Sequence, residues 1–191
     1  MCHFTSNMYG YPNTNISEYD FIMTHDDEAG YDKSLEMDPF EEFKETGALF
    51  GAFKTGLREP HQGHIDTRVG LWELTKEFIT ENNITPKNPK LKALLTSSNA
   101  AQEFHFLDWC DSYIINTSFF QSDLWKKWIL KVNTSGGIYK GRWGDNEIYS
   151  LFVNMVQDEI YNIGALYPQT LNQGKFRNIQ NFAPSVKDAA K

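Results

Sequence analysis

Three consecutive acidic residues, Asp26, Asp27 and Glu28, follow a short apolar segment at residues 19–23. Because side chains alternate along a strand, Asp26 and Glu28 should point the same way and Asp27 the opposite way. Ligands usually bind at the carboxyl ends of strands in α/β sheets, and a converging carboxylate pair is relieved by a hard divalent cation. The triplet therefore predicts a metal site. The alternative is a solvated acidic turn that caps a helix.

A second group of chemically useful residues lies at residues 135–145 (SGGIYKGRWGD). Its paired glycines allow the backbone to bend sharply and approach a ligand closely. Arg142 could clamp a phosphate in a bidentate fork, and Trp143 offers an aromatic face on which a sugar can stack. Asp145 is placed to cap the next helix. The alternative is a tight turn in which Asp145 is only a cap and Trp143 belongs to the core.

Histidines give weaker signals. His61 and His64, with Asp66 close behind, could present a His-x-x-His pair to zinc, but the loop offers no obvious fourth ligand. His105 stands between two phenylalanines and is better read as a satisfied histidine on an apolar strand than as a catalytic base. His25 directly precedes the acids, where it either tunes them or covers the turn.

Bulk composition limits the classes of function. The chain has 191 residues, of which 40% are hydrophobic and 15% aromatic, enough for one compact domain. A net charge of −7 without a concentrated basic face argues against a nucleic-acid partner. No stretch approaches the roughly 18 apolar residues of a membrane span, and residues 1–5 show no leader pattern. Cys2 and Cys110 could pair or remain buried thiols.

The spacing of apolar and capping residues predicts an α/β fold with a parallel or mixed sheet. Asp38, Pro39 and Glu41 mark a helix start, Gly47 ends that helix, and residues 48–54 should form a buried strand. Further helices are expected at residues 67–81, 90–96 and 122–132 and from residue 145 onward, with an extended piece after the glycine pair. We expect a domain at residues 1–171 and a loosely ordered tail at residues 172–191.

One apolar face is expected on the helix at residues 67–81. Val69, Trp72 and Phe78 recur at a spacing close to the helical period. These three side chains should therefore face the core together.

Three blocks of the sequence resemble glycosyltransferase family 15, the yeast-type α-1,2-mannosyltransferases. Residues 1–23 resemble the family's M-C-R-F…Y-D/E-Y-Y entry to its acidic turn. Residues 70–78 (GLWELTKEF) resemble its T-L-W-x-x-T-x-x-F helix. Residues 135–145 are similar to its S-G-G-x-Y-x-x-R-W-G-D block, which is the most specific of the three.

The resemblance implies a GT-A-like (Rossmann-like) fold that transfers mannose from GDP-mannose to a glycan or glycoprotein acceptor with retention, using Mn²⁺. Asp26 would contact the metal, and Glu28 would be its second acidic partner. The implied substrate-binding residues are Arg142, Trp143, Asp145 and, on the acceptor side, His64. The resemblance also implies the Golgi lumen as the location. A cytoplasmic location stays open because the chain shows no signal or anchor.

The chain departs from the family pattern at three places. Tyr149 stands where the family's A-P-x-H-S segment has a metal-binding histidine. Tyr113 stands where the family's N-F-E-I segment has a glutamate, and Asp111 is the nearest carboxylate. Asp111 and Tyr113 are therefore the candidate catalytic residues near the anomeric carbon. The family's nucleotide-binding half precedes M-C-R-F, which matches residue 1 here, so we expect an incomplete fold and reduced affinity for GDP-mannose.

Two alternatives to an active transferase follow from the residues. One is a truncated or degenerate, catalytically silent relative that at most binds glycans or a partner. The other is an unrelated metal-dependent hydrolase that uses the acidic triplet. The R-W-G-D block argues against the hydrolase, because phosphohydrolases do not need that element.

Overall fold

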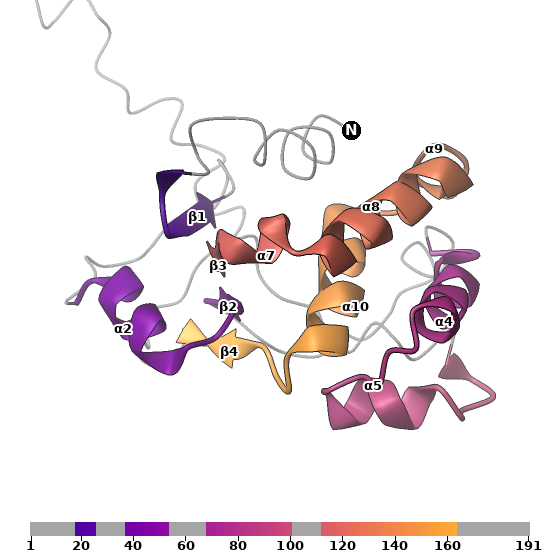
Figure 1. Ribbon diagram of the computed structural model, residues 1–191, viewed down its shortest axis with the longest axis horizontal. Coiled ribbons are helices and arrows are strands. Elements are labelled where there is room, and N and C mark those ends of the chain that lie inside the picture. The colour runs from indigo at the N-terminus through magenta and orange to yellow at the C-terminus, as the bar shows by residue number, and fades with distance from the viewer. Residues whose placement is uncertain (1–17, 26–36, 54–67, 101–111, 164–191) are drawn as a thin grey trace, which may run out of the picture.

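The computed structural model describes residues 18–25, 37–53, 68–100 and 112–163 (Figure 1). Its sheet has the strand order β1-β3-β2-β4. The central strand β3 (Ser112–Asn116) pairs antiparallel with β1 (Phe21–His25) and with β2 (Phe50–Ala52), while β4 (Tyr161–Asn162) runs parallel to β2. The expected α/β architecture with a mixed sheet is confirmed.

Alternate residues of β3 serve two different cores. Ile114 packs with Phe43 of α2 (Pro39–Thr46) in a small cluster on one face of the sheet. Tyr113 and Ile115 belong to the main core on the other face. Because neighbouring side chains in a strand point to opposite faces, the sheet is sandwiched between α2 and the remaining helices. Figure 1 shows α2 on the left of the sheet and α8 and α10 on the right.

Helix α2 begins and ends where its sequence predicts. The carboxylate of Asp38 accepts a hydrogen bond from the Phe40 N–H at 2.9 Å, and Pro39 takes the first helical position, where no N–H is needed. Gly47 ends the helix with φ +66°, a conformation that suits glycine. The following strand β2 is shorter than the expected 48–54 and covers only three buried residues.

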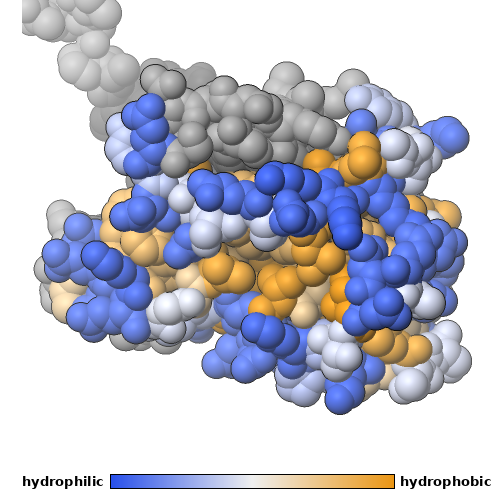
Figure 2. Space-filling model, viewed as in Figure 1, coloured by the Kyte–Doolittle hydropathy of each residue, from blue (hydrophilic) through white to orange (hydrophobic). Residues whose placement is uncertain are grey.

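The main core is built from helices. They are α4 (Leu71–Glu81), α5 (Pro89–Leu94), α7 (Ser118–Gln121), α8 (Asp123–Ser135), α9 (Gly137–Lys140) and α10 (Asp145–Val156). On α8, Trp125, Trp128 and Val132 recur at helical spacing and are buried. Helix α10 is buried on nearly all sides, from Ile148 to Met155. Figure 2 shows hydrophilic residues over α2 and α4, with apolar side chains gathered between them.

Two expected features near these helices are wrong. Helix α4 starts at Leu71, because Gly70 adopts φ +82° and stops helical geometry from extending further back. Val69 therefore lies in a turn, 70% exposed, instead of on the buried face, whereas Trp72 and Phe78 are buried as expected. The piece after the glycine pair is the short helix α9 and not an extended segment.

A side-chain amide joins the end of α10 to β2. The Gln157 side-chain oxygen accepts hydrogen bonds from the backbone N–H groups of Leu49 and Phe50, at 2.9 and 3.0 Å. Its NH₂ group donates to the Phe50 carbonyl at 2.9 Å and also to the Glu159 carbonyl. The amide thus takes the place of a strand residue beside β2, just before the chain continues as β4.

Replacing Gln157 by Ala should lower the free energy of unfolding by about 1–3 kcal/mol, because buried backbone groups of β2 lose their partners. Urea denaturation followed by circular dichroism measures the loss. The matched control is Gln121→Ala at an exposed position of α7, expected within about 0.5 kcal/mol of the parent. Equal losses in the two variants would contradict a joining role for Gln157.

Candidate functional site

The block at residues 135–145 connects α8 to α10 through one turn of helix. Gly136 ends α8 with φ +71°, and its N–H donates to the Asn133 carbonyl. Helix α9 follows at once, closed by hydrogen bonds from the Tyr139 and Lys140 N–H groups to the Gly136 carbonyl. Arg142 then adopts φ +55°, a conformation uncommon outside glycine, and its side chain is exposed. The turn places an exposed guanidinium directly before a buried indole.

The indole of Trp143 fills the space that two glycines leave open. A Cβ atom on Gly137 would lie 2.3 Å from the ring, and one on Gly141 would lie 2.7 Å from the ring nitrogen. The indole N–H donates to the Val69 carbonyl at 2.9 Å, and Trp143 is only 6% exposed. Of its two expected roles, this burial supports the core position, because sugar stacking needs an exposed ring face.

Asp145 lies one residue inside the helix that it was expected to cap. Gly144 holds the N-cap position of α10, so the cap expected from the sequence is wrong by one residue. The Asp145 carboxylate accepts a hydrogen bond from the Asn146 N–H at 3.0 Å, in the first turn of the helix. A carboxylate in this position is still stabilised by the positive end of the helix dipole.

An ion pair just beyond this block makes a second contact with the turn before α4. The Arg68 guanidinium donates two hydrogen bonds to one oxygen of the Glu147 carboxylate, at 2.8 and 3.1 Å, and both side chains are largely buried. Together with the bond from Trp143 to Val69, it docks residues 135–147 onto the turn before α4. Sequence reasoning missed this pair, because the partners are 79 residues apart and carry no local signal.

Tyr113 and Tyr149 lie side by side in a cluster of aromatic rings. Their ring centroids are 6.0 Å apart, and the two residues are 3% and 0% exposed. Phe50 stacks on Tyr113 at 5.1 Å, and Trp125 stacks on Tyr149 at 5.2 Å with an interplanar angle of 11°. Two positions 36 residues apart along the chain, β3 and α10, therefore meet at one place in the core.

Several expected site residues lie outside the described ranges. They are Asp26, Glu28, His64 and Asp111, together with His61, Asp66, His105, both cysteines and the tail at residues 172–191. The structure does confirm the strand that precedes the acidic triplet, since β1 ends at His25. The metal-binding role of the triplet stays a prediction.

A family model described as glycolipid 2-alpha-mannosyltransferase, of glycosyltransferase family 15, matches residues 1–166. The chain belongs to this family. It is 29% identical over 164 residues to the O-glycoside alpha-1,2-mannosyltransferase omh1 of Schizosaccharomyces pombe, covering 83% of this chain and 39% of that protein. It is 26% identical to "Probable mannosyltransferase YUR1" of Saccharomyces cerevisiae, covering 87% of this chain and 41% of that protein.

The fold of this family 15 chain is likewise found among solved structures. Core-mannan synthase A (CmsA/Ktr4) from Aspergillus fumigatus, in its Mn/GDP form, superposes with a TM-score of 0.65 at 18% identity. The match covers 86% of this chain and 44% of the synthase, and it establishes a GT-A-like fold. The chain thus spans about two fifths of the length of the relatives that it matches.

The described part of this family 15 chain does not fit a metal ion at the place where Tyr149 stands. Among the described residues, no group of three or more His, Cys, Asp or Glu side chains could hold one. Tyr149 is packed among rings, and a phenol is neutral at neutral pH. The two expected metal ligands, Asp26 and Glu28, lie outside these ranges.

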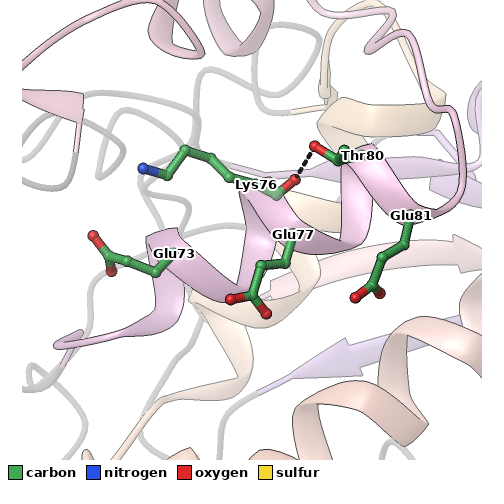
Figure 3. Close-up of a pocket in the computed structure, with 5 residues that line it drawn as sticks. All are labelled: Glu73, Lys76, Glu77, Thr80 and Glu81. Atoms are coloured by element: carbon green, nitrogen blue, oxygen red, sulfur yellow. Dashed lines mark hydrogen bonds between the residues drawn. The ribbon is translucent and has the colours of Figure 1, made fainter.

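A groove on α4 is explained by helix packing. Figure 3 shows Glu73, Glu77 and Glu81 extending to the same side of the helix, with Lys76 on another side. The Lys131 ammonium of α8 binds the Glu81 carboxylate at 2.7 Å and the Glu77 carboxylate at 3.5 Å. Glu77 and Glu81 therefore serve the contact between α4 and α8.

No helix within the described ranges is long and apolar enough to span a membrane.

Gly137→Ala should destabilise the fold by about 1–3 kcal/mol, because the new methyl group would overlap the Trp143 ring. The φ angle of Gly137 is not positive, so the backbone itself accepts alanine. In a Trp143→Leu background the same change should cost less, with a coupling of about 1 kcal/mol or more. Thermal unfolding of the four proteins measures the cycle, and additive costs would contradict the proposed contact.

Hydrogen bonding to Glu81, helped by Glu77, holds the pKa of Lys131 above its ordinary value of 10.5. The pair therefore stabilises the fold fully below that value, and its contribution is lost as the pH rises through the folded-state pKa. Lys131→Met should cost under about 1 kcal/mol at neutral pH, since the acids are exposed. The cost should vanish in strong alkali.

Chemical denaturation of the parent and of Lys131→Met at neutral and alkaline pH tests this dependence. Lys127→Met, at an exposed position of the same helix, is the control. A cost that stays constant across the alkaline range would show that it does not arise from the charge of Lys131.

Proposed function

We propose that this chain is the metal-side and acceptor-side portion of a retaining mannosyltransferase that uses GDP-mannose as donor and a glycan or glycoprotein as acceptor. The observation that carries the proposal is the family match over residues 1–166, joined to a GT-A-like fold. The names of the relatives describe α-1,2-mannosyltransferases, and one neighbour in the fold was solved with Mn and GDP. Because the chain spans two fifths of these relatives, the activity of a whole enzyme is part of the proposal.

Asp26 and Glu28 are the residues that would hold Mn²⁺ in this proposal. When bound, a divalent cation neutralises the negative charge that develops on the leaving diphosphate. The support from the structure is the strand β1, whose last residue directly precedes the triplet. Carboxylates at the end of a strand suit a hard cation, which favours oxygen ligands.

Arg142 is proposed to contact the phosphates of the donor. Its side chain is exposed, and it directly precedes Trp143, which is buried. An exposed guanidinium can offer two parallel N–H donors to a phosphate. Trp143 acts in this proposal by holding the turn, and Asp145 by presenting its carboxylate at the start of α10.

The acceptor side is proposed to lie around Asp111 and His64. Of the two candidates near the anomeric carbon, Asp111 offers a carboxylate that can stabilise positive charge on the sugar, whereas the Tyr113 ring is buried against Phe50. His64 would contact the acceptor through its loop. We further propose the Golgi lumen as the place of action, in line with the activities that the relatives' names describe.

Calorimetric titration of the full chain with GDP in the presence of Mn²⁺ tests the proposal. Binding should require the metal, and Asp26→Ala should weaken the metal-dependent binding by at least about tenfold. The matched control is Asp123→Ala, since Asp123 is a fully solvated aspartate at the start of α8, and its binding should equal that of the parent. Absence of heat with the parent protein would refute the proposed donor site and favour the silent relative.

A further inference from the structure

The backbone at Arg142 has a conformation that its surroundings must enforce. Its φ angle is +55°, in the left-handed region, where the Cβ atom of a residue other than glycine is crowded. Within the described ranges one other such residue has a positive φ angle, Asn83, and asparagine tolerates this region well. Such a conformation persists where neighbouring contacts determine it. Because the Arg142 side chain is exposed, those contacts have to come from the residues around it.

The residues on both sides of Arg142 are tied to other parts of the chain. The Gly141 N–H donates to the Gly137 carbonyl at 2.7 Å and closes α9. The Trp143 indole N–H donates to the Val69 carbonyl at 2.9 Å. Arg142 therefore lies between the end of a helix and a buried ring that is hydrogen-bonded to a distant segment.

The Glu147 side chain folds back over the first residue of the next helix. A Cβ atom on Gly144, the N-cap of α10, would lie 2.4 Å from Oε2 of this carboxylate. Its other oxygen, Oε1, accepts hydrogen bonds from Nη2 and Nε of Arg68 at 2.8 and 3.1 Å. The two side chains are only 11% and 16% exposed, so solvent and salt screen this pair less than a surface pair.

One tight turn, at residues 68–70, supplies both distant contacts. Arg68 provides the guanidinium, and Val69 provides the carbonyl oxygen for the indole. The Leu71 N–H donates to the Arg68 carbonyl at 3.0 Å, and Gly70 adopts φ +82°, directly before α4. Because the two contacts start from adjacent residues, this turn holds residues 143–147 at two points.

We propose that Arg68 and Glu147 are positioning residues for Arg142. Their ion pair keeps the turn at residues 141–144 in the conformation in which the Arg142 guanidinium meets the phosphates of the donor, and neither residue touches the donor itself. The inference rests on the proposed function, in which Arg142 is the phosphate contact. It adds two residues that lie outside the family-like blocks at 70–78 and 135–145.

Loss of the ion pair should act on binding through preorganisation. Without it, the 141–144 turn can relax toward a negative φ angle at Arg142, and the guanidinium then has to be ordered again in each binding event. The affinity for the donor should therefore fall, although the altered residue makes no contact with it. The same change should have no effect once the Arg142 side chain has been removed.

Calorimetric titration of the full chain with GDP and Mn²⁺ tests this coupling in a double-mutant cycle. Arg68→Met should weaken GDP binding by about fivefold or more, and Glu147→Gln should weaken it in the same direction. In an Arg142→Ala background, Arg68→Met should change the affinity by less than about twofold. Losses that multiply would overturn the inference, because Arg68 would then act independently of Arg142. An unchanged affinity of Arg68→Met would also overturn it.

Lys131→Met is the matched control, because it breaks an ion pair between α8 and α4 and leaves the 68–70 turn unaltered. Its affinity for GDP should equal that of the parent. A loss as large as that of Arg68→Met would overturn the inference, because loosening any contact of α4 would then have the same effect.

Limited digestion with trypsin follows the 141–144 turn without any ligand. Trypsin cleaves after arginine and lysine, so cleavage between Arg142 and Trp143 reports local opening of this turn, and cleavage after Lys127 reports opening of α8. Arg68→Met and Glu147→Gln should raise the ratio of the first rate to the second by about threefold or more. A ratio equal to that of the parent would show that the pair does not hold the turn.

The two measurements separate this inference from the proposed function. Absence of GDP binding by the parent protein would refute the proposed donor site. The digestion would still decide whether the ion pair of Arg68 and Glu147 holds the turn that carries Arg142.

Discussion

The aromatic cluster around Tyr149 is the contact on which the rest of the fold depends. It joins β2 and β3 to α7, α8 and α10. The strand β1 is held by β3, and the R-W-G-D turn is held between α8 and α10. If these rings separated, the strand that leads to the acidic triplet and the turn that carries Arg142 would lose their common support.

Short-range signals allowed much of this fold to be predicted. Asp38, Pro39 and Gly47 bounded α2 correctly, because caps act within a few residues of each other. The spacing of apolar residues predicts a helix at residues 122–132 for a similar reason, and α8 is found there. Val69 was misplaced because one left-handed residue, Gly70, breaks the helical phase, and α9 was missed because Gly136 alone makes the turn while Gly137 begins a new helix.

The candidate site was harder to predict, because its parts meet over long distances. The contacts of Trp143 with Val69 and of Arg68 with Glu147 join segments more than 70 residues apart, and no local pattern reports them. The glycine pair predicts space for a ligand, yet the Trp143 indole occupies the space beside Gly137. The space beside a glycine can be filled by a side chain of the protein as well as by a ligand.

The Gln157 amide has a consequence for the spacing of the chain. It fixes the position of a helix relative to a strand, because one side chain at the end of α10 must meet both backbone groups of Phe50 in β2 and the N–H of the preceding Leu49. An α-helix turns by about 100° per residue, so one inserted residue in α10 would swing this amide away from the strand. The number of residues between Gly144 and Gln157 is therefore set by geometry, and length changes in this region should be confined to the loops on either side.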